Sequence, residues 1–311
     1  MSDELKRLRT ALAEIAKVAI AASTDEDEGD TNDPTQEKLT CTPKSVPKNM
    51  QVKAARHAVE INPFNQPELG PLHMAAPELE VTEMFISVLT TKYWGVTPRT
   101  LTVSFMETTP SDLRRRIISH LNAWTRTGCI RFAETSGVGE VRISRGNGGY
   151  YSYLGTDILL IPRNRQTMNL QGFTMNTPES EFKRVIRHEA GHTLGFPHEH
   201  MRRALVAKID PEKAYAYFLR TQGWSRTQVD QQVLTPLNER SLMATPADQT
   251  SIMCYQLPGS ITRDGMPILG GVDINKRDYD FVGQIYPKPA SGIFADMSED
   301  STDDWESEEL A

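Results

Sequence analysis

The stretch from His188 to Glu199 constrains this chain more than any other, because it reads H-E-A-G-H-T-L-G-F-P-H-E. Residues four apart share one face of an α-helix, so His188 and His192 can direct their imidazoles at a single metal ion. Gly195 can adopt a positive φ and end that helix, after which the chain can bring His198 to the same ion. Glu189 follows the first ligand, where a carboxylate can act as a base on a water held by the metal.

Three neutral histidines favour Zn²⁺ and leave a fourth position open, as catalytic zinc sites do and closed structural sites do not. With 7 His and 20 Gly in 311 residues, composition alone would produce the five fixed positions in about one such chain in 10⁵. This estimate disfavours the alternative that the histidines only fill core or surface positions. A structural zinc domain is also disfavoured, because no cysteine-rich ligand set is present. The sequence therefore predicts one catalytic zinc ion.

The motif resembles the long zinc signature of the metzincin metallopeptidases. Within that clan it is most similar to the astacin family of peptidases, whose extension H-x-x-G-F-x-H-E-x-x-R is completed here by Phe196 and Arg202. Ala204-Leu205-Val206 stands where that family usually has acidic and basic residues. The resemblance covers about residues 92–288 and implies an α+β, metzincin-like (zincin) catalytic domain. Such a domain has a twisted, mostly parallel sheet with an antiparallel edge strand, and an active-site helix over a smaller, mostly irregular or helical C-terminal half.

A second motif, Ser251 to Tyr255, matches S-x-M-x-Y, the turn that lies beneath the zinc in metzincins. The resemblance implies that Met253 packs under the histidines without binding the ion. It also implies that Tyr255 can bind the resting zinc and then swing away to stabilise the tetrahedral intermediate. Outside this context Met253 would be an ordinary core methionine. We therefore predict that Met253 and Gly195 support the metal site and that Tyr255 is catalytic.

A third, looser motif lies at Gly148 to Gly155, which is similar to the astacin edge strand G-x-W-S-Y-x-G with Tyr151 in place of the Trp. An edge strand has unpaired backbone groups, onto which an extended peptide can add as a further strand. We therefore predict that Tyr151, Ser152 and Tyr153 bind substrate. A short aromatic hairpin with packing duties only is the alternative.

Hydrophobic periodicity outlines the elements around these motifs. Alternation predicts strands at residues 99–105, 129–132, 141–143 and 168–173. Helical spacing predicts helices starting at Ser111, Thr177 and Asp210 and a closing helix over 273–286. The helix that delivers His188 is expected to begin with Thr177 as its N-cap and to run to about Leu194.

The region before the catalytic domain reads as a leader or pro-segment, residues 1–91. Residues 1–23 predict an amphipathic helix, since Glu14 and Lys17 interrupt the apolar core that a secretory signal requires. Residues 24–50 predict a disordered linker. No run of 18 apolar residues is present, so no membrane span is expected. The family is often secreted, and the compartment stays open.

The net charge of −7 is unevenly distributed. Residues 25–33 hold six acids and residues 296–309 hold eight, without bases, whereas residues 34–295 hold 30 Lys and Arg against 24 Asp and Glu. Such acidic runs are typical of solvated, disordered segments, and we expect one at 289–311. An acidic tail that folds back over a basic cleft is the other possibility.

The three cysteines, Cys41, Cys129 and Cys254, are too few and too widely spaced for a disulfide framework. Cys41 could occupy the open zinc position as a thiolate and make the chain latent; a cysteine without such a role in a polar linker is the alternative. The F-x-G-D motif through which astacin pro-segments usually block the zinc is not found. The resemblance also implies that Glu199 pairs with the amino terminus of the mature enzyme.

Together these features predict a zinc-dependent endopeptidase with Glu189 as general base. We expect peptide or protein substrates, no nucleic-acid partner, no membrane span and a monomer. The alternative is a non-catalytic, metzincin-like protein that binds zinc and peptide without turnover, since a fold alone does not establish function.

Overall fold

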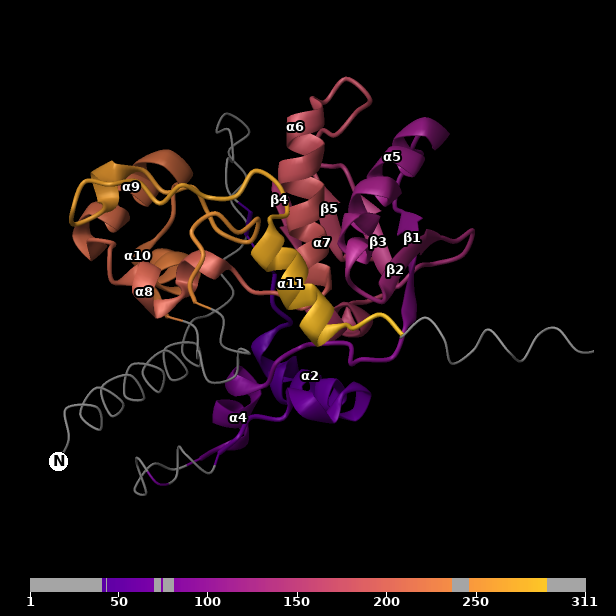
Figure 1. Ribbon diagram of the computed structural model, residues 1–311, viewed down its shortest axis with the longest axis horizontal. Coiled ribbons are helices and arrows are strands. Elements are labelled where there is room, and N and C mark those ends of the chain that lie inside the picture. The colour runs from indigo at the N-terminus through magenta and orange to yellow at the C-terminus, as the bar shows by residue number, and fades with distance from the viewer. Residues whose placement is uncertain (1–40, 43, 70–73, 75–80, 237–245, 290–311) are drawn as a thin grey trace, which may run out of the picture.

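The computed structural model describes residues 41–42, 44–69, 74, 81–236 and 246–289 (Figure 1). One half of the domain is built on a five-stranded sheet of order β2-β1-β3-β5-β4. Its strands are β1 Arg99–Phe105, β2 Ile130–Glu134, β3 Val141–Ser144, β4 Tyr150–Ser152 and β5 Met168–Leu170. Strand β1 pairs in parallel with β2 and β3, β3 pairs in parallel with β5, and β4 runs antiparallel to β5 at the edge. The mostly parallel sheet with an antiparallel edge strand is confirmed.

Two helical segments, here called helical rods, pack on this sheet and share its hydrophobic core. The first is α5, Ser111–Leu121. The second comprises α6 Glu179–Glu181, a π-helical turn η4 Phe182–Ile186, and α7 Arg187–Thr193. Fully buried residues of both rods and of the sheet form one apolar cluster, which includes Leu101, Leu113, Ile117, Trp124, Phe132, Ile143, Phe173, Phe182 and Ile186.

The start of the second rod differs from the prediction. The helix begins at Glu179, with Pro178 at the N-cap position and no side-chain cap. Thr177 is not the cap, because its hydroxyl accepts a hydrogen bond from the Thr174 backbone N–H (3.1 Å) within the preceding turn. The Thr177 hydroxyl oxygen is therefore used within the turn at 174–177 and does not cap the helix.

The C-terminal half is helical and irregular. Figure 1 shows α8, α9 and α10 on the opposite side of α7 from the sheet. The elements are α8 Arg203–Val206, α9 Pro211–Gln222, α10 Arg226–Val229, the π-helical turn η6 Asp230–Leu234 and α11 Lys276–Ile285. Helix α9 begins as predicted, since Asp210 accepts from the Lys213 N–H (3.2 Å). A separate buried cluster holds this half together and includes Leu205, Phe218, Val229, Val233, Leu257 and Ile268.

Short 3₁₀ turns connect the larger elements. They are η1 Pro63–Asn65, η2 Asn122–Arg126, η3 Gly155–Leu160, η5 Glu199–Met201 and η7 Gly259–Ile261.

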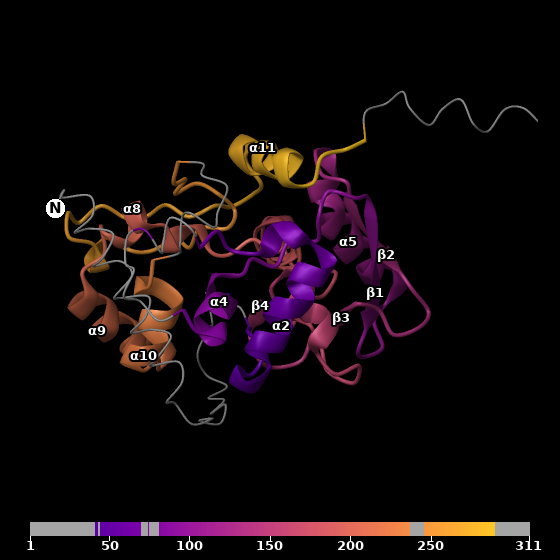
Figure 2. The same cartoon turned by 90° about the horizontal axis from the view of Figure 1, so that it is seen from below.

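The described part of the expected leader is folded against the domain. Helix α2 (Lys48–Ile61) packs on α4 (Glu83–Leu89) and on η3, and both helices lie together in Figure 2. The side chain of Asn65 accepts from the Tyr93 N–H and donates to the Ala58 and Tyr93 carbonyls, each at 2.8 Å. The disordered linker expected at residues 24–50 is therefore wrong for its described end, which is held by α2 and by contacts with β4.

The helix predicted at 1–23 and both acidic runs lie outside the described residues. That residues 1–91 form a removable leader stays a prediction. Across the described ranges, no helix has the length and apolar character needed to cross a membrane.

Candidate active site

Three imidazoles converge on one point. His188 and His192 lie one turn apart on α7, and His198 precedes η5. The Nε2 atom of His198 lies 3.2 Å from that of His188 and 3.0 Å from that of His192. The Nδ1 atoms of His188 and His192 lie 2.6 and 2.7 Å from the carbonyl oxygens of Ile252 and Phe196. Because a carbonyl only accepts, these Nδ1 atoms carry the ring hydrogens, and the Nε2 lone pairs of both rings point inward.

This donor set fits zinc. Inward lone pairs about 3 Å apart repel each other unless a cation lies between them. Tetrahedral zinc with Zn–N bonds of about 2.0–2.1 Å holds its nitrogens about 3.3–3.4 Å apart, close to the separations seen here. Burial lowers the pKa of His188 to about 4, and burial lowers the pKa values of His192 and His198 well below their usual range. The rings are therefore neutral, as ligands must be.

The end of α7 explains how His198 reaches the ion. Gly195 has φ +97°, as predicted. Its N–H donates to the His192 carbonyl (2.8 Å) and the Phe196 N–H donates to the Gly191 carbonyl (3.0 Å), which together form a Schellman motif. The resulting turn directs the Phe196 carbonyl at His192 and returns the chain to the metal-binding face.

Aromatic donors complete this helix end. The Trp94 Nε1–H donates to the Thr193 carbonyl (2.8 Å), and the Tyr286 hydroxyl donates to the Leu194 carbonyl. The last carbonyls of a helix lack partners within it, so these two bonds satisfy groups that would otherwise be buried unpaired.

The turn at 251–255 braces the site from the other side. Asp278 of α11 accepts from the Ser251 hydroxyl (2.6 Å) and from the Ile252 N–H (3.0 Å). The Ile252 carbonyl faces His188, and the Met253 carbonyl accepts from the Glu199 N–H (2.8 Å). Ser251 therefore anchors the turn. This turn positions His188 and Glu199.

Met253 also explains the glycine inside the active-site helix. A Cβ atom at Gly191 would lie 2.3 Å from the Met253 sulfur and 3.3 Å from the Trp124 ring. A helix-interior glycine costs about 1 kcal/mol relative to alanine. Here that cost leaves room for the thioether to pack directly on α7.

Gly191→Ala is therefore expected to reduce the free energy of unfolding by about 1–3 kcal/mol, because Met253 must be displaced. It should also weaken zinc binding. Urea denaturation and a zinc-competition titration measure the two effects. The matched control is Gly283→Ala in α11, where a Cβ would lie 3.5 Å from its nearest neighbour. That change should stabilise the protein by up to about 1 kcal/mol. Equal effects from the two substitutions would refute this role for Gly191.

Glu189 lies beside the three histidines and is fully buried. Neither of its carboxylate oxygens has a nitrogen or oxygen donor among the described residues, and the Cys41 thiol is the polar group beside it. Without a metal ion, burial raises the pKa of Glu189 to about 8, and a dication held by the neighbouring histidines would lower it again and favour the carboxylate. A buried carboxylate without partners is costly, so its retention indicates a group that serves a water, an ion or a substrate at this place.

Cys41 is the fourth potential ligand. Its sulfur and one nitrogen from each of the three histidines all lie within 4.8 Å of one another. Burial, and secondly the Glu189 carboxylate, raise the pKa of this thiol in the absence of a metal. A thiol that coordinates zinc is deprotonated outright. The fourth zinc position, which the sequence left open, is therefore within reach of the Cys41 sulfur.

Thr42 and Lys44 lie along the edge strand β4. The Thr42 N–H donates to the Tyr150 carbonyl (3.1 Å) and the Lys44 N–H donates to the Ser152 carbonyl (3.2 Å). Lys44 also forms a parallel bridge with Tyr153. The free edge of β4 is thus hydrogen-bonded to Thr42 and Lys44 of the same chain.

A cleft of about 560 Å³ opens beside the metal site. Its lining includes Cys41, Tyr150, Arg184, His188, Glu189, Tyr255, Leu257, Leu269 and Val272. The Arg184 side chain, one helical turn before His188, makes two bonds of 2.9 and 2.7 Å to Glu181. The cleft thus combines the reactive groups with a partly buried ion pair and an apolar wall.

The side chains of the predicted substrate-binding residues point elsewhere. The Ser152 and Thr193 hydroxyls are 2.9 Å apart in the interior, which ties β4 to α7. The Tyr151 and Tyr153 rings pack edge to face, with centroids 6.4 Å apart. Of the residues of β4, Tyr150 lines the cleft. A contribution of residues 151–153 through their backbone stays a prediction, with packing as the alternative.

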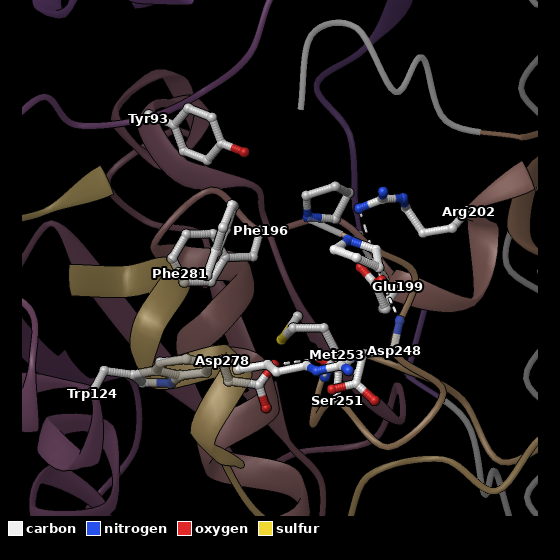
Figure 3. A pocket seen from close by; sticks show the side chains of 13 residues that line it. Tyr93, Trp124, Phe196, Glu199, Arg202, Asp248, Ser251, Met253, Asp278 and Phe281 are labelled. Atoms are coloured by element: carbon white, nitrogen blue, oxygen red, sulfur yellow. Dashed lines mark hydrogen bonds and ion pairs between the residues drawn. The ribbon is translucent and has the colours of Figure 1, made fainter. Parts of the chain in front are cut away.

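A second cavity, of about 50 Å³, lies behind the site (Figure 3). Tyr93, Phe196 and Phe281 form an aromatic wall opposite Glu199. Glu199 accepts from the Asp248 N–H (2.9 Å), and burial raises its pKa to about 7. Its expected pairing with an amino terminus stays a prediction.

Tyr255 and His200 complete the surroundings of the ligands. The Tyr255 ring is buried, with its centroid 4.2 Å from that of His198 and 4.1 Å from that of His200. The sequence pointed to Tyr255 but not to His200 or Arg184. The sequence could have indicated Arg184, since it precedes His188 by four residues and so lies on the same face of the helix. For His200 the sequence offered only its position, two residues after the predicted ligand His198.

The family model described as Astacin, a peptidase family, matches residues 88–267, more than half of the chain. The chain belongs to the astacin family. This is a family of metallopeptidases, and the converging histidines of this chain form a group that could hold the metal ion. The astacin-like metzincin fold expected from the sequence is thereby confirmed.

Individual relatives agree with this assignment. Zinc metalloproteinase nas-27 of Caenorhabditis elegans is 31% identical over 100 residues, which are 32% of this chain and only 21% of the nematode protein. A structure of myroilysin superposes with a TM-score of 0.59 at 29% identity and covers 64% of this chain and 97% of its own. A crystal structure of myroilysin gives a TM-score of 0.50 at 30% identity, over 63% of this chain and 86% of its own.

Proposed function

We propose that the chain is a zinc-dependent endopeptidase that hydrolyses peptide bonds with Glu189 as general base. The observation that carries this proposal is the unpartnered Glu189 carboxylate beside three inward-facing Nε2 atoms in an open cleft. His188, His192 and His198 would hold the zinc. When bound, the ion supplies Lewis acidity, which polarises a carbonyl and makes water more acidic.

The residues of the chain have separate tasks in this reaction. Glu189 accepts a proton from the attacking water at a carboxylate oxygen and then delivers it to the leaving amine. The Tyr255 hydroxyl has no partner among the described residues, so it is available to donate to the oxyanion that develops on the scissile carbonyl. Both side chains are buried, and the low dielectric around them strengthens both interactions.

Tyr255→Phe is expected to lower turnover by about 10²–10³-fold, the usual loss of one oxyanion donor. Its zinc content should not change, since Tyr255 is not one of the three histidine ligands. Turnover of a quenched peptide and metal analysis measure the two quantities. The matched control is Tyr150→Phe, which removes another hydroxyl at the cleft. Equal losses in the two variants would contradict the role of Tyr255.

The function itself is tested with a quenched peptide library, before and after limited trypsin treatment. Cleavage is expected, and a chelator should abolish it and added zinc restore it. A protein that binds zinc and peptide without any turnover would instead support the non-catalytic alternative. The same library profiles cleavage sites, and so defines the substrate class.

We further propose that the chain with its leader is latent. The Cys41 thiolate would occupy the fourth zinc position, and Thr42 and Lys44 already bond to the β4 edge that an extended substrate would use. Cys41 is buried against the reactive groups, which disfavours the alternative of a cysteine without function in a polar linker. Both obstacles lie on one short segment, so a single cleavage after it could remove them together.

A further inference from the structure

His200 lies beside the metal site but contributes no ligand to the converging cluster of histidines and Cys41. Its ring is fully buried and nearly parallel to that of Tyr255, with an interplanar angle of 14° and centroids 4.1 Å apart. The Tyr255 ring meets His198 at a steeper 51°. The broad face of the tyrosine therefore rests on His200, whereas its relation to the ligand is tilted.

His200 is itself held in place from the C-terminal half. Its Nε2–H donates to the Gln232 carbonyl at 2.9 Å. Gln232 lies in η6, within the last four residues of that helical segment. Carbonyls at such positions have no partner within the helix, so the bond satisfies Gln232 and fixes the plane of the imidazole at the same time.

We propose that His200 is a positioning residue, whose Gln232-anchored ring holds the Tyr255 phenol in the orientation that its oxyanion role requires. This inference rests on the proposed function. The Tyr255 hydroxyl makes no hydrogen bond within the described residues, so the orientation of this side chain depends on ring packing.

The test is a double-mutant cycle in the full-length chain carrying Cys41→Ala, so that the fourth zinc position is open. His200→Ala and His200→Phe are each placed in the Tyr255 background and in the Tyr255→Phe background. The first readout is kcat on a quenched peptide. The second is the Kd of a phosphinic peptide, whose tetrahedral phosphorus has the geometry of the reaction intermediate. Zinc content is measured throughout.

His200→Ala is expected to lower kcat and weaken inhibitor binding at least about tenfold in the Tyr255 background, as part of the 10²–10³ of an oxyanion donor. In the Tyr255→Phe background the effect should fall below about twofold, because coupled residues lose their effect together. His200→Phe keeps a flat ring but loses the bond to Gln232, so its loss should lie between those of the parent and of His200→Ala and should likewise vanish in the Tyr255→Phe background.

Equal losses in both backgrounds, loss of zinc, or no loss at all would overturn the proposal. Should His200→Ala fail to fold, His200→Leu replaces it under the same criteria, because leucine fills the space without offering a flat ring to Tyr255. If the parent chain shows no chelator-sensitive turnover, the proposed function fails. The inhibitor affinities would still report on His200.

Discussion

Glu189→Ala is expected to retain its zinc and to lose at least about 10²–10⁴-fold in turnover, the usual contribution of a general base. The histidines keep their geometry in this variant, because His188 and His192 are oriented by the Ile252 and Phe196 carbonyls and not by the carboxylate. Removing a buried, unpartnered carboxylate should also raise stability slightly. Loss of activity with a gain in stability is the signature of a group retained for chemistry.

The measurement is turnover of a quenched peptide by the trypsin-treated chain, together with metal analysis and a denaturation curve. Glu179→Ala is the matched control, since Glu179 is an exposed glutamate of the same helical rod and pairs with Arg116 on the surface (2.9 Å). The control should stay within about twofold of the parent, because exposed ion pairs contribute little. Parent-like cleavage by Glu189→Ala would exclude the proposed mechanism.

Cys41→Ala is expected to raise the turnover of the untreated, full-length chain by about tenfold or more. A tethered ligand competes at an effective concentration in the millimolar range, so its removal opens the fourth zinc position to substrate and water. Full activity should still require trypsin, because Thr42 and Lys44 would remain hydrogen-bonded to β4. The variant should therefore lie between the untreated and the treated parent.

The comparison uses initial rates before and after trypsin, with a hydroxamate titration as a readout of the open metal position. Cys129→Ala is the matched control, since Cys129 is a half-buried thiol whose sulfur contacts the Val96 carbonyl (3.6 Å) and not the zinc site. Identical rates for Cys41→Ala and the untreated parent would remove the thiol from the mechanism of latency. Activation by Cys129→Ala would point to a general loosening of the fold.

The sequence alone determined the parts of this protein that depend on local geometry. The four-residue spacing of His188 and His192 works because an α-helix repeats every 3.6 residues. Gly195 was predictable because few other residues adopt positive φ. Asp210 likewise marks the start of α9, where a capping side chain is required.

Only the tertiary structure decided what depends on contacts between distant segments. Cys41 lies 147 residues before His188 in the chain. The pattern of residues in the sequence does not show that its sulfur lies within 4.8 Å of the histidine nitrogens. The same holds for the stacking of His200 on Tyr255, for Met253 packed on Gly191, and for the inward-facing hydroxyl of Ser152. Such contacts are set by how whole elements pack, because side chains far apart in sequence meet only when the core between them is complete.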